Sequence, residues 1–242
     1  MRKEIIGSCE LYLGDCREVL PGLGRVDAVV TDPPYSSGGF QESGKSAGSL
    51  GTRGLERIAA DNLSTRGYVK LLSFVCSKTR ADEYFCFTDW RMWTSTFDCF
   101  EVGFIRVRNM IVWDKKQMGM GLPWRNQHEL IAYGKRTSAK NITGNNGNVI
   151  QFARQANEDH PTQKPVGLIE ILLNNSSART VLDPFMGSGT TGVACANLGR
   201  GFIGIEVDPQ HYGTALRRIE AAYRQPRLFA EPAPKPTQET ML

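Results

Sequence analysis

The stretch Thr180–Asp208 reads TVLDPFMGSGTTGVACANLGRGFIGIEVD, and its pattern predicts a buried strand, a glycine-rich turn, a helix and a second strand. Gly187, Gly189 and Gly192 have the spacing G-x-G-x-x-G, and Glu206 stands at the end of the second predicted strand. Glycines at such a turn let backbone N–H groups approach a ligand closely, and an acid in that place can accept hydrogen bonds from ribose hydroxyls. The stretch therefore predicts an α/β fold with a nucleotide-like ligand at the carboxyl end of a strand.

Similar strand and helix patterns extend through most of the chain. Further strands are predicted in the runs CELYLGD, VDAVVTD, EYFCFTDW, IRVRNMIVWDK and HELIAYGKR. Helices are predicted over Thr65–Thr79, Trp90–Val102, Pro165–Asn174, Thr190–Leu198 and Pro209–Arg224. Because strands alternate with helices, we expect a doubly wound, mostly parallel sheet with helices on both faces.

The composition is that of one globular domain, which we expect to span residues 1–224. The chain has 242 residues, 40% of them hydrophobic, and a net charge of +4, which permits a polyanionic partner without demonstrating one. It contains no apolar run long enough for a signal peptide or a membrane span. Its six cysteines form no C-x-x-C pair, so we expect no metal site and a reducing, cytoplasmic location.

Three segments do not fit the strand and helix pattern. Residues 36–62 are rich in Gly and Ser and are predicted to form a mobile loop, residues 137–159 a polar insertion, and residues 225–242 a Pro-rich, disordered tail. Long loops inside a compact domain are usually functional.

A second motif lies at Thr31–Phe40, TDPPYSSGGF, directly after the apolar run VDAVV. Two consecutive prolines cannot continue a sheet ladder or enter a helix interior. Asp32 and Tyr35 are therefore expected on a stiff, irregular backbone at a strand end, where open α/β sheets carry their chemistry.

Taken alone, the glycine motif is also the dinucleotide-binding fingerprint, so a NAD-dependent oxidoreductase is an alternative. Three features argue against it: Asp183 would face the pyrophosphate, the motif follows four or five other strands, and no acid/base pair for hydride transfer is evident. A phosphate-binding P-loop fits less well, because no Lys-Ser or Lys-Thr closes the turn.

Together, DPPY and DPFMGSG resemble the β class of S-adenosylmethionine-dependent DNA amino-methyltransferases. The similarity extends to LGDCREVLPGL, IVWDK, HELIAYGKR and HPTQKPVGLIE, in that family's order and over most of Leu11–Arg218. It implies a Rossmann-like methyltransferase fold with permuted motif order, S-adenosylmethionine as cofactor and DNA as partner. The DPPY tetrapeptide favours adenine N6 as the acceptor. Cytosine N4 is the alternative, and an inactive nucleic-acid-binding module is a further one.

The resemblance also implies roles for individual residues. The catalytic tetrapeptide would be Asp32, Pro33, Pro34 and Tyr35. Asp32 and the Pro33 carbonyl would accept the amino N–H bonds of the target base, and Tyr35 would stack on that base once it is flipped out of the duplex. The residues that would hold the cofactor are Asp15 at the adenine amino group, Glu206 at the ribose hydroxyls, Asp183 at the methionine amino group, Thr162 and Lys164 at the methionine carboxylate, Phe185 in the methionine pocket, and Gly187 and Gly189 in the turn.

Contacts with DNA are expected from loop-like and basic positions. The candidates are Phe40, Arg53, Lys115, Lys116, Trp124, Arg125 and Lys140. Residues 137–159 would form a small target-recognition region, and the apolar residues between Trp93 and Phe104 could support a homodimer. The tryptophans at 90, 93 and 113 are interpreted as core or interface packing.

Overall fold

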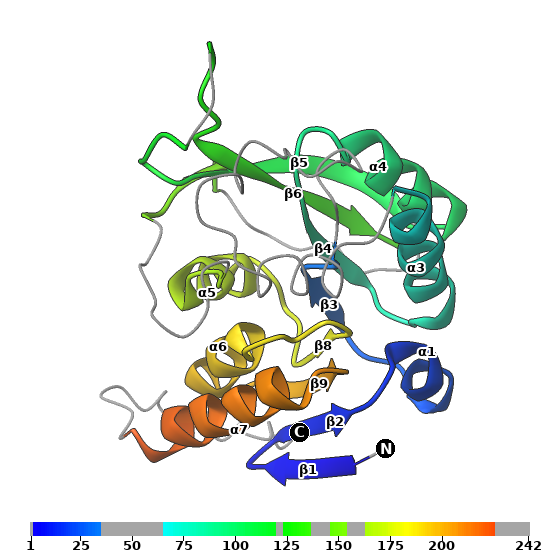
Figure 1. Ribbon diagram of the computed structural model, residues 1–242, viewed down its shortest axis with the longest axis vertical. Helices are drawn as coiled ribbons and strands as arrows, with labels where there is room; N and C mark the ends of the chain where they lie inside the picture. Colours follow the sequence, from blue (N-terminus) through cyan, green and yellow to red (C-terminus); the bar gives the residue numbers. More distant parts are fainter. Residues whose placement is uncertain (1, 35–64, 120–122, 137–145, 154–162, 226–242) are drawn as a thin grey trace, which may run out of the picture.

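The computed structural model describes residues 2–34, 65–119, 123–136, 146–153 and 163–225 (Figure 1). The strands in this part of the chain are β1 (Arg2–Ile6), β2 (Cys9–Leu13), β3 (Ala28–Thr31), β4 (Glu83–Thr88), β5 (Arg106–Asp114), β6 (His128–Lys135), β7 (Val149–Gln151), β8 (Thr180–Asp183) and β9 (Gly201–Glu206). The helices are α1 (Cys16–Val19), the 3-10 helix η1 (Leu20–Gly22), α3 (Thr65–Lys78), α4 (Trp93–Val102), α5 (Val166–Asn174), α6 (Thr190–Leu198) and α7 (Pro209–Arg224). These strands form one sheet in the order β1-β2-β9-β8-β3-β4-β6-β5-β7.

The centre of the sheet is parallel. β2, β9, β8, β3 and β4 all run in the same direction, which confirms the predicted doubly wound α/β fold. Every residue of β3 and β4 is buried, as expected for strands that are covered on both faces. Beyond β4 the sheet becomes antiparallel, because β6 runs opposite to both β4 and β5. The first residues of β6 therefore lie beside the last residues of those two strands.

Helices cover both faces of this sheet. In Figure 1, α5, α6 and α7 lie on one side of it, and α1, α3 and α4 lie on the other. Each set buries its own apolar cluster, which includes Leu168, Phe202 and Ile219 on the first side and Tyr68 and Phe100 on the second. Each such side chain stabilises the fold by roughly 1.5–3 kcal/mol relative to an exposed one.

The strand connections diverge between β3 and β8, which are direct neighbours with Val29 paired to Leu182. The connection from β8 passes through α6 to β9 on one side, and the connection from β3 passes through α3 to β4 on the other. In open α/β sheets, ligands bind in the crevice outside the carboxyl ends of two strands that diverge in this way. The two Asp-Pro sequences, which follow β3 and end β8, therefore meet at the place where this fold holds its ligands.

Residues near both ends of the described chain meet beside α7. The backbone N–H of Ser8 donates to the Tyr223 hydroxyl at 3.0 Å. Gly7 has a φ of +56°, and a Cβ atom there would lie 2.5 Å from the Tyr223 ring. This approach between the β1–β2 turn and α7 requires glycine.

The structure contains elements that the sequence patterns did not predict. β7 lies within residues 137–159, which were predicted to be a polar insertion, and it pairs in parallel with β5. β1 was missed because it is an edge strand that begins with three charged residues. Helix α4 begins at Trp93 and not at Trp90. The Asp89 carboxylate accepts the backbone N–H bonds of Arg91 and Met92 and thereby fixes a turn before the helix.

Several predictions concern residues outside the described ones, namely the loop at 36–62, most of the insertion at 137–159 and the tail from 226 onward. The assignment of residues 1–224 to one domain stays a prediction. Within the described residues, no helix combines the length and apolarity needed to cross a bilayer. The same residues hold no group of three or more His, Cys, Asp or Glu side chains placed to bind a metal ion.

Candidate active site

Asp32 leaves the sheet directly after β3, and its two carboxylate oxygens have different surroundings. Oδ2 forms an ion pair with the ammonium group of Lys164. Oδ1 is buried and receives no hydrogen bond from any described residue. Burial raises the pKa of Asp32, although the Lys164 charge opposes this rise. A buried acceptor without a donor is costly unless a ligand supplies one. Oδ1 is therefore suited to accept an N–H bond from a bound molecule.

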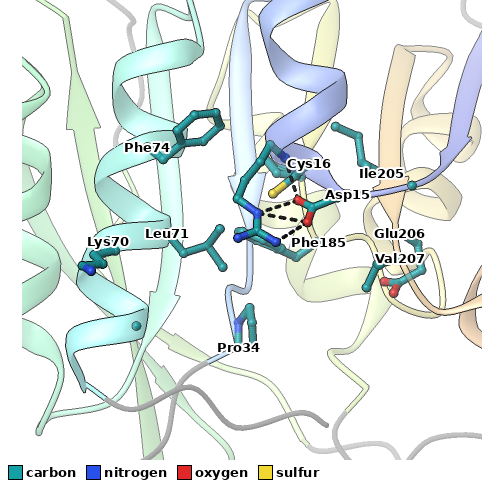
Figure 2. A pocket seen from close by; sticks show the side chains of 14 residues that line it. Asp15, Cys16, Pro34, Lys70, Leu71, Phe74, Phe185, Ile205, Glu206 and Val207 are labelled. Atoms are coloured by element: carbon teal, nitrogen blue, oxygen red, sulfur yellow. Dashed lines mark hydrogen bonds and ion pairs between the residues drawn. The ribbon is translucent and has the colours of Figure 1, made fainter. Parts of the chain in front are cut away.

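A cavity of about 570 Å³ opens beside this strand end, between α3 and the ends of β2, β8 and β9. Its lining is largely apolar, as in most small-molecule sites. In Figure 2, Leu71 and Phe74 of α3 form one wall, Phe185 lies near the middle, and Glu206 lies on the opposite side. Pro34 of the DPPY tetrapeptide also lines the cavity, so the two predicted motifs share one site.

The lining includes residues that the sequence did not single out. They are Gly14 after β2, Cys16 and Arg17 of α1, Gly67, Lys70, Leu71 and Phe74 of α3, Pro184, and the pair Ile205 and Val207. In the sequence, the apolar residues of α3 have the spacing of an ordinary core-facing stripe. That stripe gives no signal that two of its members face a cavity.

Asp15 is the N-cap residue of α1 and lines the cavity. Its carboxylate accepts the backbone N–H of Arg17 at 2.8 Å, which caps the helix, and forms an ion pair with the Arg17 guanidinium. Hydrogen bonds from Arg17 hold the pKa of Asp15 below its ordinary value. The structural role of Asp15 as a helix cap and its place on the cavity wall are thus compatible. Its predicted contact with an adenine amino group stays a prediction.

Glu206 fixes the glycine-rich turn. Its carboxylate accepts the backbone N–H of Gly187 at 2.9 Å and that of Asp208 at 2.8 Å. Burial raises the pKa of Glu206, while these backbone hydrogen bonds oppose the rise. The carboxylate therefore connects the turn after β8 to the end of β9, on the wall of the cavity.

The two turn glycines differ in their surroundings. Gly187 has a φ of +52°, and a Cβ atom there would meet nothing within 4 Å. Gly189 has a φ of +80°, and a Cβ atom there would lie 2.8 Å from the Ala215 Cβ atom on α7. Gly189 is thus required for the contact between the turn and α7. This packing requirement is separate from the ligand role predicted for it.

This difference predicts unequal effects of alanine at the two positions. Gly189→Ala combines a left-handed backbone with overpacking, and we expect it to lower the free energy of unfolding by roughly 2–4 kcal/mol. Gly187→Ala meets only the backbone cost of roughly 1–2 kcal/mol. Urea denaturation of both variants tests this, and equal losses would contradict the packing role of Gly189.

Asp183 is buried at the end of β8, and each of its carboxylate oxygens accepts a hydrogen bond within the protein. It accepts hydrogen bonds from the Phe185 backbone N–H at 3.1 Å and the Thr191 hydroxyl at 2.9 Å. Burial raises its pKa to about 7. Asp183 is not among the residues that line the cavity, although Pro184 and Phe185 are. Its contact with a cofactor amino group stays a prediction.

Two of the lysines predicted to bind ligands are paired with carboxylates. Lys164 contacts Asp32 and Glu129, and Lys115 contacts Glu129 at 2.6 Å with only a fifth of its side chain exposed. The role of Lys115 as a phosphate contact stays a prediction. The methionine-carboxylate role of Lys164 stays a prediction.

Other candidates for nucleic-acid contact are exposed. Lys116, Trp124 and Arg125 lie on the surface between β5 and β6, and Trp124 is 89% exposed. Trp113 is buried, as the sequence predicted, whereas Trp90 is 57% exposed after β4. The predicted site residues Tyr35, Phe40, Arg53, Lys140 and Thr162 lie outside the described residues.

The arrangement of these motifs has counterparts among known proteins. A family model described as DNA methylase matches residues 26–217. The chain belongs to the DNA methylase family. The predictions of a DNA amino-methyltransferase and of its α/β fold are thereby confirmed.

Individual relatives of this DNA methylase agree with the family assignment. The type II methyltransferase M2.DpnII of Streptococcus pneumoniae is 27% identical over 224 residues, which cover 81% of this chain and 83% of the relative. The DNA adenine methyltransferase YhdJ of Escherichia coli is 43% identical over 83 residues, which cover 31% of this chain and 28% of the relative. The crystal structure of the M1.HpyAVI–SAM complex has a TM-score of 0.66 and 23% identity, and covers 87% of this chain and 99% of that chain. At that identity, the structural likeness supports the fold alone.

Proposed function

We propose that this DNA methylase transfers a methyl group from S-adenosylmethionine to N6 of adenine in DNA. The observation that carries the proposal is the buried, unpartnered Oδ1 of Asp32, next to a cavity that Pro34 of the same tetrapeptide lines. An amino group of a base that entered this place would supply the missing donor. The adenine-specific name of YhdJ and the DPPY tetrapeptide favour adenine, and cytosine N4 is the alternative acceptor.

The residues around the cavity fit S-adenosylmethionine. Its volume of about 570 Å³ is in the range of small-molecule sites. Glu206 and Asp15 offer carboxylate oxygens for hydroxyl and amino groups, and Leu71, Phe74 and Phe185 offer apolar surface for a purine ring. When bound, S-adenosylmethionine supplies an electrophilic methyl group on a sulfonium.

The task of the chain is mainly to position a weak nucleophile. The lone pair of an exocyclic amine is delocalised into the ring, and accepting its N–H bonds favours a pyramidal nitrogen. Asp32 Oδ1 is suited to accept one of these bonds, and we expect the Pro33 carbonyl to accept the other. Such positioning can account for most of the acceleration of a displacement reaction. The amine becomes acidic only as its new bond forms, so its proton can then pass to Asp32 or to water.

DNA is the proposed partner. The exposed Lys116 and Arg125 offer positive charge for phosphates, and Trp124 offers an aromatic surface. A homodimer is a further proposal. It is supported by exposed apolar side chains on and after α4, at Phe97, Val102 and Phe104.

The proposed function is tested by incubating the purified protein with plasmid DNA and methyl-labelled S-adenosylmethionine. We expect the label in N6-methyladenine after digestion to nucleosides, and modification-aware sequencing of the same DNA gives the target site. Label in N4-methylcytosine would overturn the choice of base. Absence of label in any nucleoside, with cofactor binding verified by calorimetry, would overturn the activity.

A further inference from the structure

We propose that Glu129 is a positioning residue for methyl transfer, which acts through Lys164 to hold the Asp32 carboxylate in place. This inference rests on the proposed function, because it assumes that Asp32 contacts the target amine. Glu129 does not line the cavity, and Lys164 lies between it and Asp32, paired with both carboxylates.

The antiparallel direction of β6 brings Glu129 to the reactive edge of the sheet. Glu129 is the second residue of β6 and pairs with Trp113 near the end of β5, while the next residue, Leu130, pairs with Thr88 at the end of β4. A parallel strand in this place would put its first residues at the opposite edge. The sheet thus places Glu129 close to Lys115, which follows β5, and to Lys164, which precedes α5.

Charges of opposite sign alternate along the resulting cluster. Asp32 pairs with Lys164, Lys164 lies 3.4 Å from Glu129 Oε2, and Lys115 lies 2.6 Å from Glu129 Oε1. The side chains of Lys164, Glu129 and Lys115 are each a fifth exposed or less, so water screens their interactions weakly. Both lysines lie within ion-pair distance of the Glu129 carboxylate, although its buried Oε2 receives no hydrogen bond from the described residues, and two carboxylates pair with the Lys164 ammonium.

Lys164 needs a second carboxylate because of where its ammonium group lies. It is mostly buried, with Nζ 5.3 Å from the centre of the Phe87 ring. Burial alone would lower the pKa of Lys164, but Asp32 and Glu129 outweigh it and raise the pKa above its ordinary value. If Asp32 alone neutralised Lys164, a proton arriving at Asp32 from the amine would leave a buried cation without a counterion. Glu129 supplies that counterion throughout.

The charge of Glu129 also influences the ionisation of Asp32. The groups that face Asp32 are Lys164, Glu129 and Lys115, together with Asp183 on β8. Cys86 on β4 also faces it and stays neutral, because burial raises the thiol pKa. The negative charge of Glu129 raises the pKa of Asp32. Removal of that charge therefore makes Asp32 easier to ionise and weaker as a base.

The test compares wild-type protein with Glu129→Gln, which keeps the shape and removes the charge. We expect kcat for DNA methylation to fall roughly 10- to 100-fold, as for a misplaced reacting group, with the KM for S-adenosylmethionine unchanged. We also expect the acidic limb of the plot of kcat against pH to move to lower pH. Glu129→Asp, which keeps the charge, should return this acidic limb to its wild-type position. The control is Glu170→Gln, since Glu170 lies on α5 and hydrogen-bonds Asn197 away from the site.

The outcomes separate this inference from the proposed function. An unchanged kcat in Glu129→Gln, or a lower kcat with an unmoved acidic limb, would overturn the inference and leave the methylation reaction standing. Carbon-13 NMR of the aspartate carboxyl groups provides a readout without DNA, with the Asp32 signal identified by its loss in Asp32→Asn. Its titration should shift to lower pH in Glu129→Gln, and an unshifted titration would also overturn the inference. A wild-type protein that methylates no DNA would instead overturn the proposed function.

Discussion

Asp32→Asn is expected to lower kcat for DNA methylation by about 10³-fold, within the range for the loss of a group that handles a reacting proton. Asparagine keeps the size of the side chain but removes the charge that Lys164 binds. Its amide can also present N–H bonds where the target amine needs an acceptor. The affinity for S-adenosylmethionine should stay unchanged, because the proposed contact of Asp32 is with the target amine and not with the cofactor. Single-turnover methylation assays and calorimetry measure the two quantities.

Asp27→Asn is the matched control for this experiment. Asp27 lies at the opposite end of β3, where its carboxylate accepts the backbone N–H bonds of Arg179 and Thr180 at 2.9 and 2.8 Å. An asparagine oxygen can accept both bonds, so this variant should fold and methylate as the wild type does. If Asp32→Asn retained the wild-type kcat, the proposed role of Asp32 would be wrong.

Asp183→Asn is expected to raise the Kd for S-adenosylhomocysteine by about 30-fold or more, the effect of losing one partner of a buried charge pair. The proposed partner of Asp183 is the amino group of the methionine portion. The amide can still accept from the Phe185 N–H and can donate to the Thr191 hydroxyl, so the local fold should persist. Thr191→Val, which keeps the charge of Asp183, should raise this Kd less than Asp183→Asn does. An unchanged Kd in Asp183→Asn would refute the charge contact.

The pH dependence of the same affinity gives a second check. The pKa of Asp183 is raised to about 7, so the carboxyl group of the free protein is largely protonated at pH 6 and ionised at pH 8. A cationic amino group prefers the ionised form, and the wild-type affinity should therefore rise as the pH passes through about 7. In Asp183→Asn, the affinity measured by calorimetry should depend less on pH between pH 6 and pH 8.

Asp183 should also affect stability in the absence of ligand. Its folded pKa of about 7 lies above the reference value of 3.8, so the folded state binds its proton more tightly than the unfolded state. The stabilisation from this proton is complete below about pH 4 and is lost as the pH rises through about 7. The Tm of Asp183→Asn should therefore exceed that of the wild type at pH 8 and equal it near pH 4. Thermal unfolding at both pH values tests this.

The meeting of the two Asp-Pro motifs could be predicted from the sequence because it follows from local patterns. Each motif comes after a short buried strand, and parallel strands place their carboxyl ends at one edge. The charge cluster around Lys164 could not be predicted in this way. It depends on the direction of β6, and the run HELIAYGKR has the same pattern in a parallel or an antiparallel strand. The apolar residues of α3 that line the cavity, Leu71 and Phe74, could not be recognised for a similar reason, because core and ligand pocket both require apolar side chains.

The contact of Ser8 and Gly7 with Tyr223 bears on how the linear order of the motifs could be changed. It brings the β1–β2 turn next to the end of α7, so a short peptide linker could connect α7 to β2 with the loss of only the edge strand β1. Circular permutation with a new opening between β6 and α5 would then place the glycine-rich turn ahead of the DPPY tetrapeptide. The spatial relation of the two motifs would be the same in both proteins, since β3 and β8 are held together by their own ladder.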